Sequence, residues 1–351
     1  MNRNSRPVRP WLWALAGFLI AMPGVAVAQT KVATSAGQFL KIGVGPRAIA
    51  MGGAYVASIN DVTSLYWNVG AFQMAEKSEL VFSHTDWLVD TKFQWLGFML
   101  HLGDENSLGV SLTQLDYGEE EVTTVGAPGG TGEKWSAKDL AVGLSYSRRL
   151  TDRFSMGATV KYIEQRIWNS SATTFAFDLG LLFVTGFNDM RLGVSMTNFG
   201  GDLKLDGRDL TRRIDIDPQN SGSNKALVGD LKTDPWALPL AFRVGLAMDV
   251  VKTDELLFTL AGDAIRPNDN ESYLNLGGEL GWRNGSGTHS YGLFLRGGYK
   301  SVVGIDTEEG LSLGGGLMYT AGGIGSIEVD YAYTQFGLFG NLNTIAVSIG
   351  W

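Results

Sequence analysis

The sequence predicts an all-β fold, a fourteen-stranded antiparallel transmembrane β-barrel whose lumen holds a short, partly helical N-terminal hatch. Three observations predict it. The chain opens with a segment typical of exported proteins, its later segments alternate between apolar and polar residues, and its long connections fall on one side of the resulting sheet. The predicted parts are a signal peptide (residues 1–28), the hatch (29–77) and the barrel (78–351).

The first 28 residues have the layout of a secretory signal peptide. Three arginines, without any acidic residue, precede an apolar run from Trp11 to Met22. The small residues Ala26-Val27-Ala28 follow, as at a cleavage site. An N-terminal membrane anchor is the less favoured alternative, because the run falls short of the roughly 20 apolar residues that a spanning helix needs.

The predicted mature chain is acidic and contains no cysteine. Its basic residues number 28 − 3 = 25 against 36 acidic ones, a net charge of −11. This balance argues against a nucleic-acid partner, because phosphate contacts need a basic surface. Without cysteine, neither disulfides nor thiolate metal sites are available. After the signal no window of about 18 apolar residues occurs, which excludes helical membrane spans. A large soluble exported domain and a closed barrel remain.

Alternation with a period of two favours the barrel. From Phe154 to Tyr162 apolar residues take every second position, and many later segments do the same. A soluble sandwich shows such alternation too, so the number of segments decides more than any one of them. We predict fourteen strands, near residues 78–86, 91–102, 107–117, 135–150, 154–167, 172–184, 190–198, 239–250, 255–265, 272–283, 289–300, 309–320, 326–335 and 342–351.

The connections between these strands are asymmetric. An even number of strands leaves both termini on the periplasmic side, as in bacterial barrels. If the first strand runs outward, the two long connections, residues 118–134 and 199–238, lie outside the cell. The connections at 103–106 and 151–152 then lie inside, and they are short. This asymmetry is expected of an outer-membrane barrel and not of a soluble sandwich.

The chain ends with NTIAVSIGW, which alternates to its last residue. An aromatic terminus in the lipid-facing register resembles the final strand that the outer-membrane assembly machinery recognises, whereas the last strand of a soluble domain is the alternative. We therefore predict a barrel-closing strand whose lipid-facing residues are Ile345, Val347, Ile349 and Trp351.

Fourteen strands enclose a lumen too wide for side chains to fill, since about eight already suffice to fill one. Residues 29–77 are the predicted plug. The glycine-rich stretch from Gly43 to Phe72 lacks the glycine spacing of a phosphate-binding loop. We instead expect Gly52 and Gly53 to let the backbone turn or approach the wall closely.

Two short helices are expected within the plug. Pro46 suits the first turn of one helix, and Asn60-Asp61 suits the cap of a second that runs towards Asn68. An unpaired charge in an enclosed site is costly. Arg47 and Asp61 should therefore pair with each other or with charges of the lumen.

No catalytic residue is predicted. His84, His101 and His289 lie on separate predicted strands without a shared spacing, and no Ser–His pairing follows from the sequence. Solvated lumen charge is favoured over an acid–base pair for the acidic residues that alternation turns inward. These are Asp178, Asp263, Glu279, Glu328 and Asp330.

The stretch from Gly45 to Ala57, followed by Asp61 and by Tyr66-Trp67-Asn68, resembles the N-terminal signature of the PorV/PorQ family of outer-membrane proteins. The resemblance continues in RFSMGATVKYI (153–163) and DYAYTQFGLFG (330–340) and covers essentially the whole mature chain. The relatives usually read Asn-Pro-Ala after the tryptophan, whereas Asn68 is followed by Val69-Gly70, so a hatch movement that depends on this proline is not implied. The residues that match the signature are Gly45, Arg47, Met51, Gly52, Gly53, Asp61, Tyr66, Trp67 and Asn68.

The resemblance implies a fold similar to the fourteen-stranded long-chain fatty acid transporters (FadL) and a place in the bacterial outer membrane. PorV-like members serve type IX secretion by binding the C-terminal signals of exported proteins, and the charged connection at residues 200–236 favours such a binding role. Transport of hydrophobic small molecules, as in FadL, is the alternative. The implied partners are membrane lipid, cargo signal domains, secretion-system components and a hydrophobic ligand; no nucleic acid, cofactor, metal or enzymatic activity is expected.

Overall fold

The computed structural model describes residues 32, 34–75, 77–217, 219, 226–285, 289–304, 307–322 and 325–351. The predicted signal peptide (residues 1–28) lies outside these residues. Within the described part of the chain, no helix is long and apolar enough to span a membrane.

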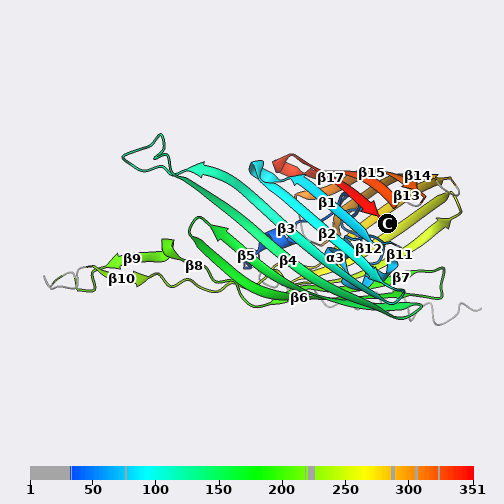
Figure 1. Cartoon of the computed structure of the whole chain (residues 1–351), viewed down its shortest axis with the longest axis horizontal. Coiled ribbons are helices and arrows are strands. Elements are labelled where there is room, and N and C mark those ends of the chain that lie inside the picture. The colour runs from blue at the N-terminus through cyan, green and yellow to red at the C-terminus, as the bar shows by residue number, and fades with distance from the viewer. Residues whose placement is uncertain are drawn as a thin grey trace, which may run out of the picture.

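The fold is a closed fourteen-stranded antiparallel β-barrel, as predicted (Figure 1). Each barrel strand pairs with its neighbours along the chain, β7 pairs with β11 across the longest connection, and β17 pairs with β1 to close the ring. The barrel strands are β1 (Glu79–Asp86), β2 (Lys92–Leu102), β3 (Asn106–Glu121), β4 (Lys134–Thr151), β5 (Phe154–Ile167), β6 (Ser170–Val184), β7 (Arg191–Gly200), β11 (Ala241–Lys252), β12 (Leu256–Pro267), β13 (Tyr273–Asn284), β14 (His289–Val303), β15 (Glu309–Ala321), β16 (Gly325–Phe336) and β17 (Asn341–Gly350).

The remaining elements belong to the plug and to the connections. Inside the barrel lie η1 (Gln38–Lys41), α2 (Pro46–Ala50), α3 (Ser64–Trp67) and η2 (Val69–Met74). The long connection between β7 and β11 contains β8 (Asp206–Gly207), η4 (Arg208–Leu210), β9 (Thr211–Ile214) and β10 (Leu227–Asp230), and two other connections contain η3 (Leu88–Asp90) and η5 (Gly337–Phe339).

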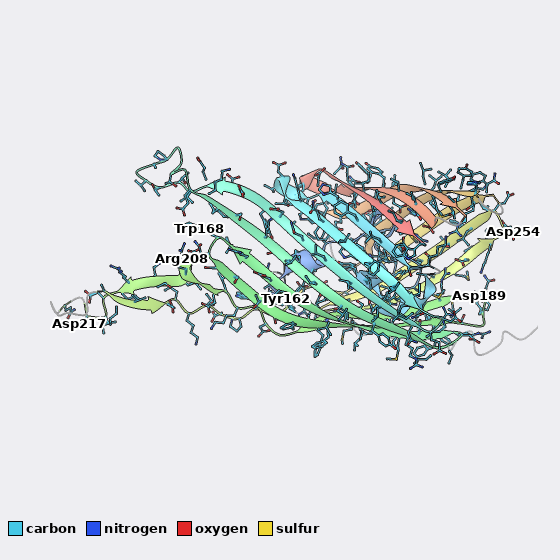
Figure 2. All side chains as sticks on the ribbon, viewed as in Figure 1. Tyr162, Trp168, Asp189, Arg208, Asp217 and Asp254 are labelled. Atoms are coloured by element: carbon cyan, nitrogen blue, oxygen red, sulfur yellow. The ribbon has the colours of Figure 1, made fainter. Side chains whose placement is uncertain are left out.

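The two ends of the barrel differ. The β3–β4 connection and the β9–β10 hairpin project from one end, which we call the outer end, and the C-terminal end of β17 points towards the other (Figure 1). Figure 2 shows Arg208 and Asp217 on the projecting segment, and Asp189 and Asp254 at the opposite, inner end.

Strand β17 illustrates the two faces of the wall. Ile345, Val347 and Ile349 are 43–49% exposed, whereas Thr344, Ala346 and Ser348 between them are buried. The exposed side chains form part of the apolar outer surface that faces lipid. Trp351 follows the strand, and its ring stacks on Phe98 of β2 at a centroid distance of 6.1 Å.

Candidate functional site: the hatch and the outer vestibule

The segment from residue 34 to residue 75, which we call the hatch, fills the lumen. Helix α2 contacts β14 to β17, and η2 contacts β3 to β7 on the opposite side. Its apolar side chains form two buried clusters with the wall. The hatch therefore touches the barrel around most of its circumference.

Helix α2 begins where a glycine and a proline favour its first turn. Gly45 precedes it with a φ of 80°, and Pro46 occupies its first position. A Cβ atom at Gly45 would lie 2.8 Å from the side chain of Thr63, so glycine also allows the two helical segments to pack. This start directs Arg47 towards the wall.

Arg47 joins the hatch to strand β13. Its Nε and Nη2 atoms donate to the two carboxylate oxygens of Glu279 over 2.7 and 2.6 Å, which is the bidentate geometry of a strong ion pair. Nη1 also reaches Asp61 of the hatch over 3.2 Å. Burial opposes the positive charge, but the carboxylates of Glu279 and Asp61 outweigh it and hold the pKa of Arg47 well above its ordinary value.

The ion pairs continue across the wall behind Glu279. Arg296 of β14 donates to Glu279 over 2.6 Å and also contacts Glu328 and Asp330 of β16. Glu279 is 2% exposed and Arg296 is 4% exposed, so both charges depend on these partners. Three of the five acidic residues that alternation turns inward thus belong to one network with Arg47.

A second set of contacts holds the segment after α2. The backbone N–H groups of Tyr55 and Val56 donate to the carboxylate of Asp263 on β12 over 2.7 and 2.9 Å. The Tyr55 hydroxyl donates to Asp61. Burial raises the pKa of Tyr55 well above its ordinary value, so the hydroxyl keeps its proton and remains a donor.

Gly52 and Gly53 lie at the closest approach to the wall. Both have positive φ, 64° and 74°, and a Cβ atom at Gly52 would lie 2.6 Å from the backbone nitrogen of Tyr299. Met51 is 1% exposed and packs against Gly277 and Gly298. Any side chain at Gly52 would push the hatch away from β14.

The Tyr66-Trp67-Asn68 stretch forms hydrogen bonds with other residues of the hatch and with β6. Trp67 donates from its indole nitrogen to the carbonyl of Val44, and Tyr66 donates to the carbonyl of Leu40. The Asn68 amide group donates to Val56 within the hatch and to Leu181 on β6. Its oxygen accepts from the N–H of Gly70.

The predicted cap of the second helix is displaced. Thr63, and not Asn60 or Asp61, occupies the N-cap position of α3. Asp61 instead accepts from the backbone and hydroxyl of Thr63, and its other oxygen is used by Arg47 and Tyr55. One oxygen of Asp61 thus contacts the residue at the start of α3, and the other belongs to the network with Arg47.

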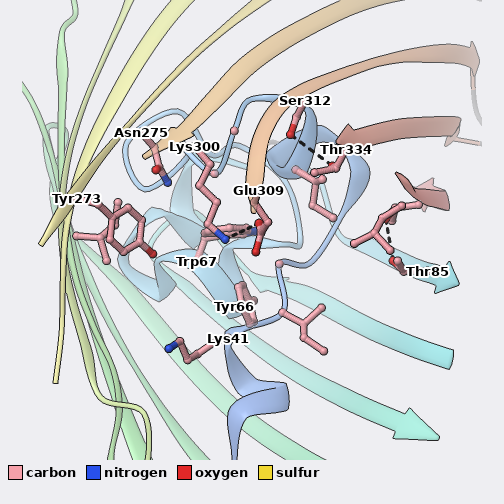
Figure 3. Close-up of a pocket in the computed structure, with 18 of the residues that line it drawn as sticks. Lys41, Tyr66, Trp67, Thr85, Tyr273, Asn275, Lys300, Glu309, Ser312 and Thr334 are labelled. Carbon is pink, nitrogen blue, oxygen red and sulfur yellow. Dashed lines mark hydrogen bonds and ion pairs between the residues drawn. The ribbon is translucent and has the colours of Figure 1, made fainter. Parts of the chain in front are cut away.

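A small cavity of about 70 Å³ lies between the hatch and the outer half of the wall (Figure 3). Lys300 and Glu309 line it and form an ion pair at 2.5 Å, with Trp67 beside them. Arg243 of β11 lines the same cavity, with its guanidinium 5.8 Å from the Trp67 ring. Alternation marks Arg243 as inward-facing, but its neighbours in space are not visible in the sequence.

A larger cavity of about 680 Å³, which we call the outer vestibule, lies at the outer end. The base of the long connection closes one side of it, where Leu203 and Trp236 exchange two backbone hydrogen bonds of 2.8 and 2.9 Å. Its lining is mainly apolar and is drawn from β3 to β6, the long connection and the start of the hatch: Ala36, Tyr117, Trp135, Ala137, Asp139, Gln165, Arg166, Ile167, Ala172, Leu203, Leu205, Thr233, Asp234 and Trp236.

The hatch is tied directly to the rim of the vestibule. The N–H of Ala36 donates to Ala237 of the long connection over 2.9 Å, and the N–H of Gly37 donates to the side chain of Gln165 over 3.0 Å. A ligand in the vestibule would therefore contact residues that hold the first turn of the hatch. Sequence reasoning missed this cavity, because its residues come from four strands and a connection.

The parts of the chain described by the structure show no metal centre. No group of three or more histidine or acidic residues within them is placed to hold a metal ion. The three histidines have separate surroundings: His84 lies near Asp86, His101 bonds to Ser107 and His289 bonds to Tyr319.

A family model described as "Type IX secretion system protein PorV" matches residues 25–210. No curated protein matches the sequence. Several solved structures share the fold at low identity. The CymD monoaromatic hydrocarbon channel is 14% identical with a TM-score of 0.55, covering 88% of this chain and 97% of that one. The Pseudomonas putida toluene transporter TodX is 13% identical with a TM-score of 0.52 over 88% and 97%. A Pseudomonas aeruginosa FadL homologue is 12% identical with a TM-score of 0.50 over 88% and 98%.

Proposed function

Because the chain belongs to the PorV family of type IX secretion system proteins, we propose that this outer-membrane barrel binds exported proteins at the cell surface and hands them on during secretion. The observation that supports this most is that the hatch, held by ion pairs, fills the lumen, while the outer vestibule lies at the outer end of the barrel. This arrangement favours binding of a partner at the outer end.

The state of the lumen supports binding over conduction. Arg47 of the hatch pairs with Glu279 of the wall, a buried carboxylate that Arg296 of the wall also holds, and breaking such a pair is strongly unfavourable. A path through the lumen would require the hatch to release these contacts. A partner at the outer end requires no such change.

The long connection supplies a surface for a protein partner. Residues 200–236 contain many charged residues, and the β9–β10 hairpin projects away from the barrel (Figure 2). The vestibule beneath adds apolar side chains, including Trp135 and Trp236. A charged rim around aromatic anchors is typical of protein-binding surfaces.

A pull-down from native outer membranes tests this proposal. The bait is the tagged full chain, and the variant replaces residues 208–230 with two glycines, which removes the hairpin but keeps the Leu203–Trp236 pairing. We expect wild type to retain exported proteins through their C-terminal signal domains, together with secretion-system components, and the variant to lose the exported proteins.

The matched control shortens the other long connection by replacing residues 124–131 with two glycines. Retention of cargo should persist in this control. Equal recovery of cargo by wild type and by the hairpin deletion would contradict the proposed binding surface.

The vestibule also favours a second candidate function, the passage of hydrophobic small molecules. Its apolar lining suits such a ligand, and the fold is shared with a toluene transporter and a monoaromatic hydrocarbon channel. Passage would require the hatch to move, so a locked hatch should abolish it.

The lock can be built at the pair Lys41 and Asp269, whose charged atoms lie 3.1 Å apart. The chain contains no cysteine, so Lys41→Cys with Asp269→Cys supplies the only two thiols, to be joined by a short bifunctional reagent. If the barrel transports toluene into liposomes, cross-linking should stop the uptake and cleavage of the reagent should restore it. Uptake that is unaffected by the lock would exclude passage past the hatch.

A further inference from the structure

The small cavity beside the hatch contains a buried arginine without an acidic partner. Arg243 is 8% exposed, donates from Nη1 to the hydroxyl of Thr197 over 2.9 Å and lies over the ring of Trp67. Among the described residues, no carboxylate lies within ion-pair distance of its guanidinium. Arg243 lines the cavity, and its remaining donors have no hydrogen-bond acceptor among the described residues.

The other charges around the cavity are already matched. Lys41 pairs with Asp269 over 3.1 Å, and Lys300 pairs with Glu309 over 2.5 Å. Asp263, two positions from the residue paired with Arg243 on β12, acts on Arg243 only beyond ion-pair distance. One of its oxygens accepts from backbone N–H groups of the hatch, and the other has no hydrogen-bond partner among the described residues. The cavity thus has one positive charge without a direct counter-charge.

A buried guanidinium in this situation favours an anionic ligand. A charge removed from water is stabilised by an opposite charge with which it shares hydrogen bonds. The planar fork of arginine matches the two oxygens of a carboxylate. A single charge without a direct ion-pair partner also favours a monoanion over inorganic phosphate, which carries more than one charge near neutral pH.

The size and lining of the cavity limit the ligand further. A volume of about 70 Å³ holds roughly five water-sized groups, which is too little for a long acyl chain. Trp67 and Ile49 supply apolar surface. Tyr273 and Asn275 supply polar groups (Figure 3). These walls fit a short organic body attached to the charged group.

We propose that this cavity is a binding site for a small monoanionic carboxylate. The carboxylate occupies the free donors of Arg243, and the body of the ligand packs against Trp67. The site lies on the outer side of the hatch, because Thr85 and Thr334, near the outer ends of β1 and β16, also line it. It is separate from the outer vestibule, so it does not depend on cargo binding.

Fluorine NMR on the purified full chain in detergent tests the site, with trifluoroacetate as the probe and trifluoroacetamide as its neutral match. We expect trifluoroacetate to bind, acetate to displace it, and trifluoroacetamide to bind at least about tenfold more weakly, because hydrogen bonds between charged groups are the stronger ones. Equal binding of the two probes, or no binding of trifluoroacetate, would overturn the proposal.

Variants locate the site. Arg243→Gln should weaken trifluoroacetate binding about tenfold or more, Arg243→Lys should weaken it less, and Arg283→Gln, at an exposed arginine of β13, should leave it unchanged. Unchanged binding by Arg243→Gln would contradict the assignment. If that variant does not fold, binding of the two probes to wild type and to Arg243→Lys still tests the proposal. Displacement by inorganic phosphate as readily as by acetate would overturn the preference for a carboxylate.

Discussion

The two halves of the hatch are fastened to the barrel in different ways. The half around α2 carries Arg47 and therefore ion pairs with the wall. The half around η2 has, among the described residues, no ion pair with the wall and depends on hydrogen bonds and close backbone packing. The half around α2, the charge-held half, adds ion pairs to close backbone packing. The half around η2, the shape-held half, has close packing and hydrogen bonds without ion pairs.

The shape-held half depends on glycines in both partners. A Cβ atom at Gly70 would lie 2.5 Å from the backbone of Gly180 on β6, and one at Gly157 on β5 would lie 2.6 Å from the carbonyl of Val69. Ser155 of β5 donates to the carbonyl of Gly70 over 2.6 Å. Backbone packed this closely cannot be released by a change of charge.

The charge-held half also packs closely, at Gly52, but its attachment depends in addition on a few charged side chains. Arg47 reaches the wall through Glu279, and Glu279 also holds Arg296. Any motion of the hatch should therefore begin at α2, with η2 as the fixed side. This difference can be tested by weakening each half in turn.

Glu279→Gln should give the largest effect. It leaves Arg47 and Arg296 facing each other without the shared carboxylate, and losing one partner of a buried pair costs about 3 kcal/mol or more. The value should lie at the lower end of this range, because Arg47 keeps Asp61 and Arg296 keeps Asp330. We expect a lower free energy of unfolding in urea, and proteolysis within residues 45–57 before any cleavage near η2.

Asp254→Asn is the matched control. This exposed carboxylate lies in the turn between β11 and β12, so its replacement should change stability by less than about 0.5 kcal/mol and leave the hatch protected. Cleavage near η2 before cleavage near α2 in the Glu279→Gln variant would refute the assignment of the mobile half.

The sequence was sufficient for the architecture of the wall. Alternation located all fourteen barrel strands to within a few residues, because lipid on one side and the lumen on the other impose a period of two on every strand. The glycine and proline pattern also located α2 and the close approach at Gly52. These features are local, so residues near in sequence reveal them.

The partners of the hatch could not be predicted in the same way. Arg47 and Glu279 are 232 positions apart, and only the curvature and register of the barrel bring them together. The same holds for Arg243 and Trp67, and for the four strands that line the vestibule. The cap predicted at Asn60-Asp61 lies at Thr63 instead, and Asp61 contacts both Thr63 and Arg47, a partner that the sequence pattern of a helix end does not reveal.

Gly70→Ala should have the next largest effect. Its added methyl group would meet backbone atoms of Gly180 and Leu181 at 2.5 to 2.6 Å, and overpacking of this kind costs about 1–3 kcal/mol. Here the hatch should loosen at η2, which amide hydrogen exchange of residues 68–75 would detect. In Gly126→Ala the added methyl group meets nothing within 4 Å, so this control should be within about 0.5 kcal/mol of wild type. Equal loss of stability in the two variants would contradict the conclusion that close packing at Gly70 holds this half.

The smallest effect concerns the start of the hatch, which is held by Asp269 in the β12–β13 connection. Burial would raise the pKa of Asp269, but hydrogen bonds from Gln38 and Ser35 and the charge of Lys41 bring it below its ordinary value. A depressed pKa means that the attachment is fully present above the ordinary value of about 3.9 and is lost as the pH falls through the lower, folded value. Lys41 is partly exposed, so the ion pair itself contributes less than about 1 kcal/mol.

Hydrogen exchange of residues 34–41, corrected for intrinsic rates, should therefore be constant from pH 8 to about pH 5 and increase only below about pH 4. Asp269→Asn should raise the exchange at neutral pH and remove its dependence on pH, whereas exchange around α2 should not change. An increase that already begins near pH 6 would mean that a group other than Asp269 controls the start of the hatch. Such a result would indicate a group that titrates in the range of histidine. The start of the hatch would then be attached neither by an ion pair of the kind at α2 nor by close packing of the kind at η2.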